Sequence, residues 1–252
     1  MAMKITIVRH GDPDYEHDSL TEKGFKQAEL LADELAKRHF DEIYLSPLGR
    51  AQKTAEPYIN KEKREAITLS WLQESPWVWD REPAVWTKNP LCYDPEKWWD
   101  APEMDVSPEN KEIFRNVENS FYDFLKKHGY EREGNYFKTN KGKNEQSILF
   151  VCHLGLGSFL LSRLIRISPA VMWHNFFMPT SSITTVQTEE AVPGYASWRI
   201  REFGAVPHLE NHPELLSEKG AFRESAESEG RFERLESHNK KHYWDKFFER
   251  VD

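Results

Sequence analysis

The sequence has few cysteines and no long apolar run. Its 252 residues include only Cys92 and Cys152, too few for a disulfide-stapled secreted scaffold. No stretch approaches the roughly 20 consecutive apolar residues that a membrane-spanning helix needs. We therefore expect a protein of the reducing cytoplasm that does not bind a membrane.

Basic residues are also fewer than acidic ones. The chain carries 34 Lys and Arg against 42 Asp and Glu, for a formal net charge of −8. Such a balance repels nucleic acids and anionic lipid surfaces, so neither is expected as a partner. A small basic pocket within an acidic surface would still suit a small anion.

Apolar runs alternate along the chain with segments of helical spacing. Thr21 can cap the first of these helices, which should end near residue 38. The alternation predicts a three-layer α/β/α sandwich with a mostly parallel sheet, in one domain spanning residues 1–252. The expected strands are 4–8, 42–45, 66–69 and 148–152, and the expected helices are 21–38, 49–59, 113–127 and 157–167.

Two segments depart from this alternation. Residues 71–110 contain six prolines and six tryptophans, which predicts an inserted cap. Its aromatic side chains either form a satellite core under a long loop or contact the substrate, where Trp77 and Trp79 would offer apolar walls. Residues 212–252 are highly charged with interspersed aromatic residues, a pattern that predicts a helical segment packed on the domain.

Two histidines follow two of the expected strands. His10 follows the first strand and Arg9, and His153 follows the strand that ends at Cys152. An open α/β sheet binds ligands at the carboxyl ends of its strands, so we expect both histidines in one site. Arg50 begins the helix predicted at 49–59 and can reach the same edge.

These residue types suit phosphate chemistry. A phosphoryl group spreads negative charge over three oxygens, so its site needs several converging cations and a nucleophile that is not an anion. Arg9 and Arg50 supply cations, and Arg50 can pair with two phosphate oxygens beside a helix N-terminus. A neutral imidazole can attack phosphorus and form a phosphohistidine.

Two other kinds of site are less compatible with the pattern. Cys152 beside His153 invites a Cys–His nucleophile, but successive strand residues point to opposite faces, so Cys152 is expected in the core. His10 and Asp12 could ligate a metal, yet Arg9 would repel a cation and no further ligand cluster is evident. We expect neither a metal nor another cofactor.

Several segments, in this order, resemble the histidine phosphatase superfamily (phosphoglycerate mutase-like, branch 1). The resemblance covers most of the chain and implies a metal-independent phosphatase of small phosphorylated molecules. The matching segments are 8–11 (VRHG), 20–28 (LTEKGFKQA), 44–55 (YLSPLGRAQKTA), 72–74 (LQE) and 150–155 (FVCHLG), with 177–184, 203–204 and 208–209 similar to the closing strands.

The resemblance assigns roles to individual residues. It makes His10 the nucleophile and Glu74 the general acid. It places His153 next to the transferring phosphoryl group, where His153 would stabilise the transition state. The Leu154 N–H would add a further contact. Arg9 and Arg50 would bind the phosphoryl oxygens.

The sequence departs from the family pattern in two places. Related sequences follow the glutamate with a Gly-containing stretch that is missing after Glu74, so Asp80 and Glu82 are alternative acids. Residues 12–15 (DPDY) stand where many members carry uncharged phosphate contacts. Carboxylates there would weaken anion affinity unless they face away or bind substrate hydroxyls.

The favoured function is hydrolysis of a small phosphorylated metabolite through a phosphohistidine. The alternative of a phosphoglycerate mutase requires a closed, water-poor site with additional cations. Residues 71–110 offer few, mainly Arg81 and Lys88. A second alternative, a non-catalytic module that binds a phosphorylated partner, is disfavoured because both arginines and both histidines of the predicted site are present.

Overall fold

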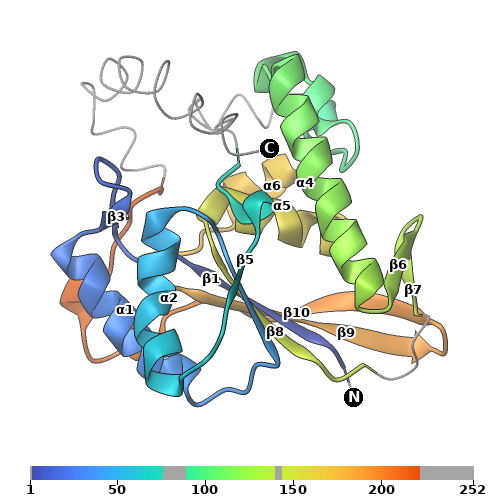
Figure 1. The fold of residues 1–252 in the computed structure, drawn as a ribbon. Helices are drawn as coiled ribbons and strands as arrows, with labels where there is room; N and C mark the ends of the chain where they lie inside the picture. The colour runs from blue at the N-terminus through green and yellow to red at the C-terminus, as the bar shows by residue number, and fades with distance from the viewer. Residues whose placement is uncertain (1, 76–88, 140–143, 222–252) are drawn as a thin grey trace. The chain divides into compact units, whose positions relative to one another are not determined.

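An eight-stranded sheet with helices on both faces forms the centre of the fold (Figure 1). The computed structural model describes residues 2–75, 89–139 and 144–221. Residues Met1–Ser217 make one compact unit, and of the following unit only 218–221 are described. Most of the segment predicted as helical at 212–252 therefore lies outside the described residues.

The sheet has a parallel half and an antiparallel half. Its order is β5-β4-β8-β1-β9-β10-β7-β6. The first four strands in this order pair in parallel. The pairs β1–β9, β9–β10, β10–β7 and β7–β6 are antiparallel. The predicted parallel sheet is thus confirmed at the core. The strands are β1 (Lys4–Arg9), β4 (Glu42–Leu45), β5 (Ile67–Thr68), β6 (Tyr130–Glu133), β7 (Tyr136–Thr139), β8 (Ser147–Cys152), β9 (Ile183–Val192) and β10 (Tyr195–Ala205).

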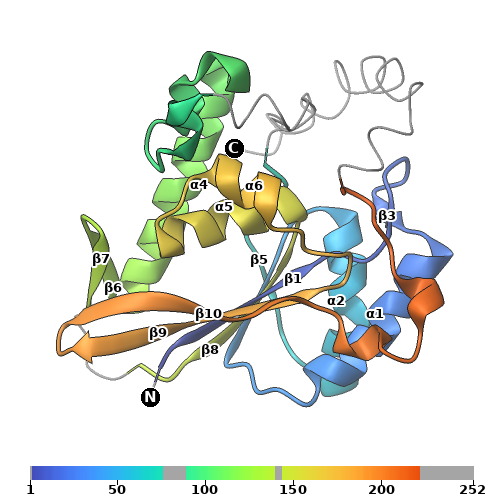
Figure 2. The same ribbon diagram turned by 180° about the vertical axis from the view of Figure 1, so that it is seen from behind.

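The helices lie in two layers, one on each face of the sheet, so the predicted three-layer architecture is confirmed (Figures 1 and 2). Helices α1 (Glu22–Leu35) and α2 (Gly49–Glu62) cover one face. Helices α4 (Pro108–Lys127), α5 (Leu154–Ile165) and α6 (Pro169–Asn175) lie on the other. Thr21 caps α1 as predicted, since its hydroxyl accepts a hydrogen bond from the Gly24 N–H at 3.1 Å.

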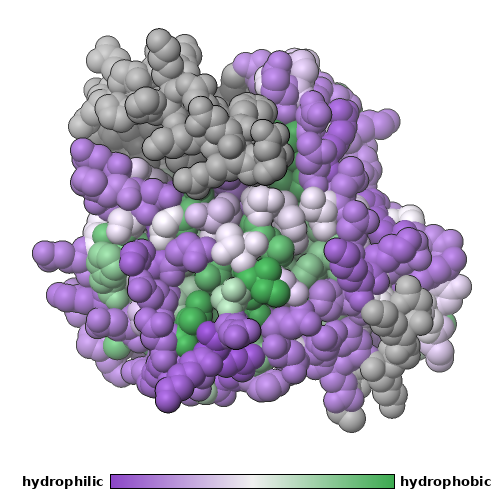
Figure 3. All heavy atoms as spheres, in the orientation of Figure 1, coloured by the Kyte–Doolittle hydropathy of each residue, from purple (hydrophilic) through white to green (hydrophobic). Residues whose placement is uncertain are grey.

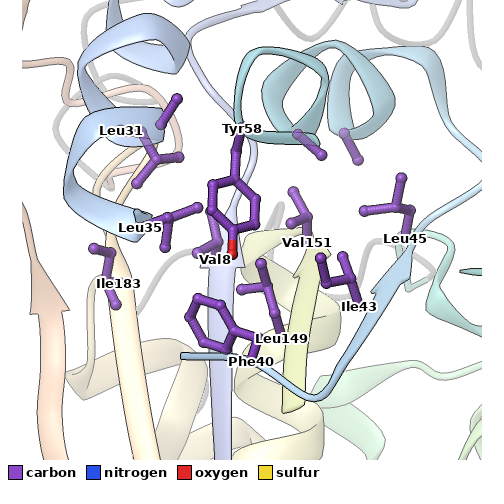
Figure 4. Close-up of a cluster of buried hydrophobic side chains, with 13 residues drawn as sticks. Val8, Leu31, Leu35, Phe40, Ile43, Leu45, Tyr58, Leu149, Val151 and Ile183 are labelled. Carbon is purple, nitrogen blue, oxygen red and sulfur yellow. The ribbon is translucent and has the colours of Figure 1, made fainter. Parts of the chain in front are cut away.

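A cluster of buried apolar side chains fixes α1 and α2 to the sheet (Figure 4). Strand residues Val8 and Val151 face Leu31 and Leu35 of α1 in this cluster. Because side chains alternate along a strand, the neighbouring residues Ile7 and Cys152 point to the other face. The remaining labelled members are Phe40, Ile43, Leu45, Tyr58, Leu149 and Ile183.

Two helices begin earlier than predicted. Helix α4 begins at Pro108, because the Ser107 hydroxyl accepts a hydrogen bond from the Asn110 N–H and proline suits the first helical position. Helix α5 begins at Leu154, directly after His153, and not at Gly157. Gly157 lies inside the helix, where an added Cβ would come within 3.1 Å of the Met178 side chain. The lack of a side chain at Gly157 lets α5 pack closely against Met178.

The described part of the Pro- and Trp-rich segment consists of short 3₁₀ turns. Trp98 is fully buried, and its ring packs edge-on against Phe114 and Trp173 with centroids 5.1 Å apart in both pairs. Trp98, Trp99, Phe114, Phe159 and Trp173 are called the aromatic cluster below. The turns are η1 (Ser70–Leu72), η2 (Pro90–Tyr93), η3 (Trp98–Asp100) and η4 (Pro102–Met104).

Trp98 is therefore a core residue, as the satellite-core alternative predicts, whereas Trp71 and Trp99 are partly buried. Trp71 packs on Phe121, Phe124 and Phe150. Trp77 and Trp79, the predicted substrate walls, lie outside the described residues.

Hydrophilic side chains cover most of the face shown in Figure 3, with apolar ones near its centre over the edge strand β5. Ile67 of this strand is exposed. None of the helices within the described ranges is long and apolar enough to cross a bilayer.

Candidate active site

His10 and His153 leave two neighbouring strands at the same edge of the sheet. Strands β1 and β8 are parallel and in register, with Arg9 opposite Cys152. The residues that follow are therefore the two histidines. Their ring centroids are 5.2 Å apart and the ring planes are inclined by 59°. Both side chains are buried, so the structure brings them together in one protected place.

The ring of His10 is held through its Nδ1 atom, which lies 2.7 Å from the Gly11 carbonyl oxygen. A carbonyl only accepts, so Nδ1 carries the proton and the lone pair of the neutral ring is on Nε2. The Gly11 N–H donates to the Thr54 hydroxyl at 2.8 Å. A Cβ at Gly11 would lie 2.9 Å from the Gly24 carbonyl oxygen, so only glycine fits here.

His153 is the N-cap residue of α5 and is completely buried. Its Nε2 lies 2.7 Å from the Ser46 hydroxyl oxygen, which also accepts a hydrogen bond from the Leu48 N–H. Burial, reinforced by the positive charge of Arg50, holds the pKa of His153 well below its usual value. The free imidazole is therefore neutral. Its Nδ1 is buried and makes no hydrogen bond to the described residues.

The two arginines are almost fully buried beside the histidines. Arg9 ends β1, and its Nη1 donates to the Met178 carbonyl oxygen at 2.7 Å. Arg50 lies in the first turn of α2 and forms an ion pair with Asp18, with Nη1 2.8 Å from Oδ1. Arg9 and Arg50 both lie close enough to lower the pKa of His153, so their charges converge on this imidazole.

Glu74 reaches the same place from the start of the Pro- and Trp-rich segment. Its Oε1 accepts hydrogen bonds from the Leu156 N–H at 2.9 Å and the Ser75 N–H at 3.0 Å. Burial raises the pKa of its carboxyl, and the opposing influence of Arg50 is smaller. The group therefore tends to hold a proton. The alternative acids Asp80 and Glu82 lie outside the described residues.

Leu154, the remaining residue of the predicted site, is the first residue of α5. At this position a backbone N–H has no acceptor within its own helix and is oriented toward an approaching anion.

The predicted place of Cys152 in the core is confirmed, since its side chain is fully buried. Burial raises the pKa of the thiol to about 12, which removes the thiolate that a Cys–His nucleophile requires. Within the described residues, no group of three His, Cys, Asp or Glu side chains is arranged to hold a metal ion.

The carboxylates of the opening loop are bonded to protein groups. Asp12 accepts hydrogen bonds from Thr21 and Ser217, at 2.8 and 2.5 Å. Asp14 lies 2.8 Å from the imidazole of His17. Both carboxylates are therefore engaged by other side chains of the protein.

Two parts of the site were not anticipated from the sequence. Ser46 follows strand β4, the parallel neighbour of β8, so the strand-end rule that identified the histidines would have found it. Ser181 has a left-handed backbone (φ 59°), and its N–H donates to the His10 carbonyl oxygen at 3.0 Å. Its hydroxyl oxygen lies 2.9 Å from Nε2 of the partly buried His208. A positive φ at serine has no reliable sequence signal.

Comparison with known families agrees with this geometry. The family model of the histidine phosphatase superfamily (branch 1) matches residues 5–201. The chain belongs to this superfamily. The resemblance seen in the sequence is thereby confirmed.

Relatives of known name are phosphatases. The chain is 25% identical over 200 residues to phosphoserine phosphatase 1 of Hydrogenobacter thermophilus, covering 75% of this chain and 88% of that protein. It is 26% identical over 184 residues to the adenosylcobalamin/alpha-ribazole phosphatase of Salmonella typhi, covering 68% and 84%. The chain is thus an enzyme of the histidine phosphatase superfamily, a phosphatase.

The fold agrees with solved structures. A phosphoserine phosphatase mutant from Entamoeba histolytica, in complex with phosphoserine, superposes with a TM-score of 0.57 at 20% identity. The match covers 82% of this chain and 99% of that one. At this identity the match shows the shared fold.

Proposed function

We propose that the protein hydrolyses small phosphomonoesters without a metal, through a phosphohistidine at His10. The observation that carries the proposal is the arrangement of His10. Its Nδ1–H is bonded to the Gly11 carbonyl, its ring lies 5.2 Å from that of His153, and the charges of two buried arginines act on His153. This arrangement offers a neutral, oriented nucleophile beside converging positive charge.

In the first step the Nε2 lone pair of His10 attacks phosphorus. A P–N bond forms while the P–O bond to the leaving group breaks, and Glu74 donates its proton to the departing oxygen. The raised pKa of Glu74 supports this role, because it keeps the proton on the carboxyl until it is needed.

The charge that spreads over the equatorial oxygens would be stabilised by Arg9, Arg50 and His153. The Ser46 oxygen already accepts the Leu48 N–H, so its own proton is available for Nε2 of His153. That assignment leaves the proton of the neutral ring on Nδ1, which can donate to a phosphoryl oxygen. The Leu154 N–H supplies another donor.

In the second step water replaces the leaving group. The Glu74 carboxylate takes a proton from the water, whose oxygen attacks phosphorus as the P–N bond breaks. The electron pair returns to Nε2 of His10, inorganic phosphate departs, and Glu74 is protonated again for the next turnover.

We also propose that residues 71–110 contribute the contacts to the leaving group. Support comes from Glu74, which belongs to this segment and is bonded to the first turn of α5 beside His153. The segment therefore begins beside the site, where Glu74 would donate a proton to the leaving group.

The test is phosphate release from 4-nitrophenyl phosphate, phosphoserine and 3-phosphoglycerate in the presence of a chelator. We expect inorganic phosphate from the substrates that are turned over, at a rate that the chelator does not change. Loss of activity with the chelator and recovery with a divalent ion would refute metal independence. Isomerisation of 3-phosphoglycerate without phosphate release would identify a mutase, and phosphate binding without any turnover a binding module.

A further inference from the structure

The loop after His10 folds back over Arg50 as a short hairpin. Strands β2 (Pro13–Asp14) and β3 (Ser19–Leu20) pair in an antiparallel ribbon, and residues 15–18 form its tip. Two side chains of the tip contact the same guanidinium. Asp18 forms an ion pair with Arg50, and the Tyr15 ring centroid lies 5.5 Å from the Arg50 Cζ atom.

Asp18 holds Arg50 with both of its oxygens, one directly and one through the backbone. Oδ1 accepts from Arg50 Nη1 at 2.8 Å, and Oδ2 accepts from the Gly49 N–H at 2.6 Å. The carboxylate is thereby fixed against the N-terminus of α2, the helix that carries Arg50.

The backbone is shaped to bring Asp18 to this position. Asp18 has a left-handed conformation (φ 45°), which is uncommon outside glycine and is tolerated best by Asn and Asp. A Cβ at Gly49 would lie 2.1 Å from the Asp18 carbonyl oxygen, so the glycine is required for this approach. The carboxylate contacts and the close approach at Gly49 compensate for the uncommon backbone conformation of Asp18.

The pair is asymmetric in its exposure. The Arg50 side chain is 3% exposed and that of Asp18 is 41% exposed, so the carboxylate lies between the buried guanidinium and solvent. A phosphoryl group that binds Arg50 would meet the negative charge of Asp18 at short range. Yet a guanidinium has five N–H donors, so Nη1 can be held by Asp18 while other N–H groups bind phosphate.

We propose that Asp18 is a positioning residue with two effects on the phosphoryl site. It holds the Arg50 guanidinium in place before substrate binds, and its charge weakens the hold on free phosphate, which favours product release. The inference rests on the proposed function, since it assigns Arg50 to the phosphoryl group. The competing explanation is that Asp18 only stabilises the start of α2.

The first test compares Asp18→Asn with wild type in the binding of inorganic phosphate, measured by calorimetry. Asparagine keeps one acceptor oxygen for Arg50 Nη1 and removes the charge. Allowing for partial solvent screening, we expect phosphate to bind roughly five- to twenty-fold more tightly to the variant. The matched control is Asp14→Asn on the same hairpin, whose carboxylate pairs with His17. Its phosphate affinity should stay within about two-fold of wild type.

The second test repeats Asp18→Asn in an Arg50→Ala background. Because Arg50 brings phosphate close to Asp18, the gain in phosphate affinity should be smaller there, and the effects of the two residues should not be additive. An equal gain in both backgrounds would contradict action through Arg50.

The positioning effect is tested by Asp18→Ala, which removes both acceptors. Relative to Asp18→Asn, we expect kcat for 4-nitrophenyl phosphate to fall about ten-fold, because Arg50 is no longer held. Thermal unfolding of each variant separates this loss from a loss of folded protein, and Asp18→Asn remains informative if the alanine variant does not fold.

The outcomes separate this inference from the proposed function. If wild type binds phosphate and Asp18→Asn binds it no more tightly, the inference is wrong and the proposed function is unaffected. If wild type neither binds phosphate nor hydrolyses any phosphomonoester, the proposed function fails, and the role of Asp18 fails with it.

Discussion

The candidate active site and the aromatic cluster are equally buried and opposite in chemistry. His153 and Trp98 are both 0% exposed. Around His153 lie a second imidazole and two guanidinium groups. Trp98 contacts other aromatic rings, and its distances to Phe114 and Trp173 suit edge-to-face contact. Burial alone therefore does not distinguish a core from a site; the chemistry of the buried groups does.

The comparison also shows how the two regions depend on each other. Burial, reinforced by the positive charge of Arg50, depresses the pKa of His153, and buried like charges repel one another, so the polar groups of the site oppose folding. The aromatic cluster favours folding and fixes α5, because Phe159 of that helix contacts Phe114 and the Trp173 indole N–H donates to the Gly155 carbonyl at 3.0 Å. His153 caps this helix. Substitutions in the site should therefore reduce activity, and substitutions in the cluster should reduce stability.

The largest expected effect on activity is that of His10→Ala. Without the nucleophile the covalent route is lost, and kcat for 4-nitrophenyl phosphate should fall by about 10⁴-fold. The free energy of unfolding, measured by urea denaturation, should fall little or rise. A matched control is Arg199→Ala on β10, where the arginine is exposed and paired with Glu189. Wild-type turnover by His10→Ala would overturn the mechanism.

The largest expected effect on stability is that of Trp98→Ala. Removing a fully buried indole should lower the free energy of unfolding by about 3–5 kcal/mol, from lost burial and the remaining cavity. Urea denaturation measures this loss, and kcat at low temperature should change little. Trp99→Ala is the control, since this neighbouring ring is only half-buried and its removal should destabilise less. A Trp98→Ala enzyme that is inactive but fully stable would contradict the division between the two regions.

Acid should lower the stability of the folded protein through the partly buried His208, whose Nε2 lies 2.9 Å from the hydroxyl oxygen of Ser181. The Ser181 N–H in turn donates to the His10 carbonyl oxygen. Burial lowers the pKa of His208 to about 4 from a usual 6.5. The unfolded chain thus takes up a proton on this group as the pH falls through 6.5, while the folded protein does not. Stability is lost between these two pH values, by at most about 3 kcal/mol. His208→Gln should remove this part of the pH dependence in urea titrations, and an unchanged slope would exclude His208 as its source.

The smallest and most selective effect is that of Glu74→Gln. An alkyl phosphate such as phosphoserine needs a proton on its leaving oxygen, so its kcat should fall by about thirty-fold. An aryl phosphate leaves without that help and should lose less than about three-fold. Equal losses on both substrates would exclude Glu74 as the acid and direct attention to Asp80 and Glu82.

The sequence sufficed where a local pattern determines the structure. The apolar runs before His10 and His153 predicted strand ends, and the parallel arrangement then brought the two histidines together. The family resemblance added Glu74, which no periodicity would have indicated. Helix starts were less accurate: the helix predicted from Gly157 begins at Leu154, and Gly157 lies inside it in close contact with Met178.

Contacts between distant segments were out of reach. Asp18 and Arg50 are 32 residues apart and meet because a hairpin tip folds back with a left-handed residue. No spacing rule encodes such a contact. Strands β6 and β7 were not predicted, and β9 and β10 were indicated only by the resemblance of 177–184 and 203–204 to the closing strands, since the exposed residues of all four strands weaken their apolar pattern.

The central claim is that His10 carries the phosphoryl group during turnover. Rapid mixing with an aryl phosphate, quenching in alkali and intact-protein mass spectrometry should trap a protein heavier by one phosphoryl group. Fragmentation should place that group on His10, and acid should remove it. The adduct should be missing from His10→Ala and present in Arg199→Ala. A phosphoryl group on another residue, or turnover with no adduct at any mixing time, would contradict the account.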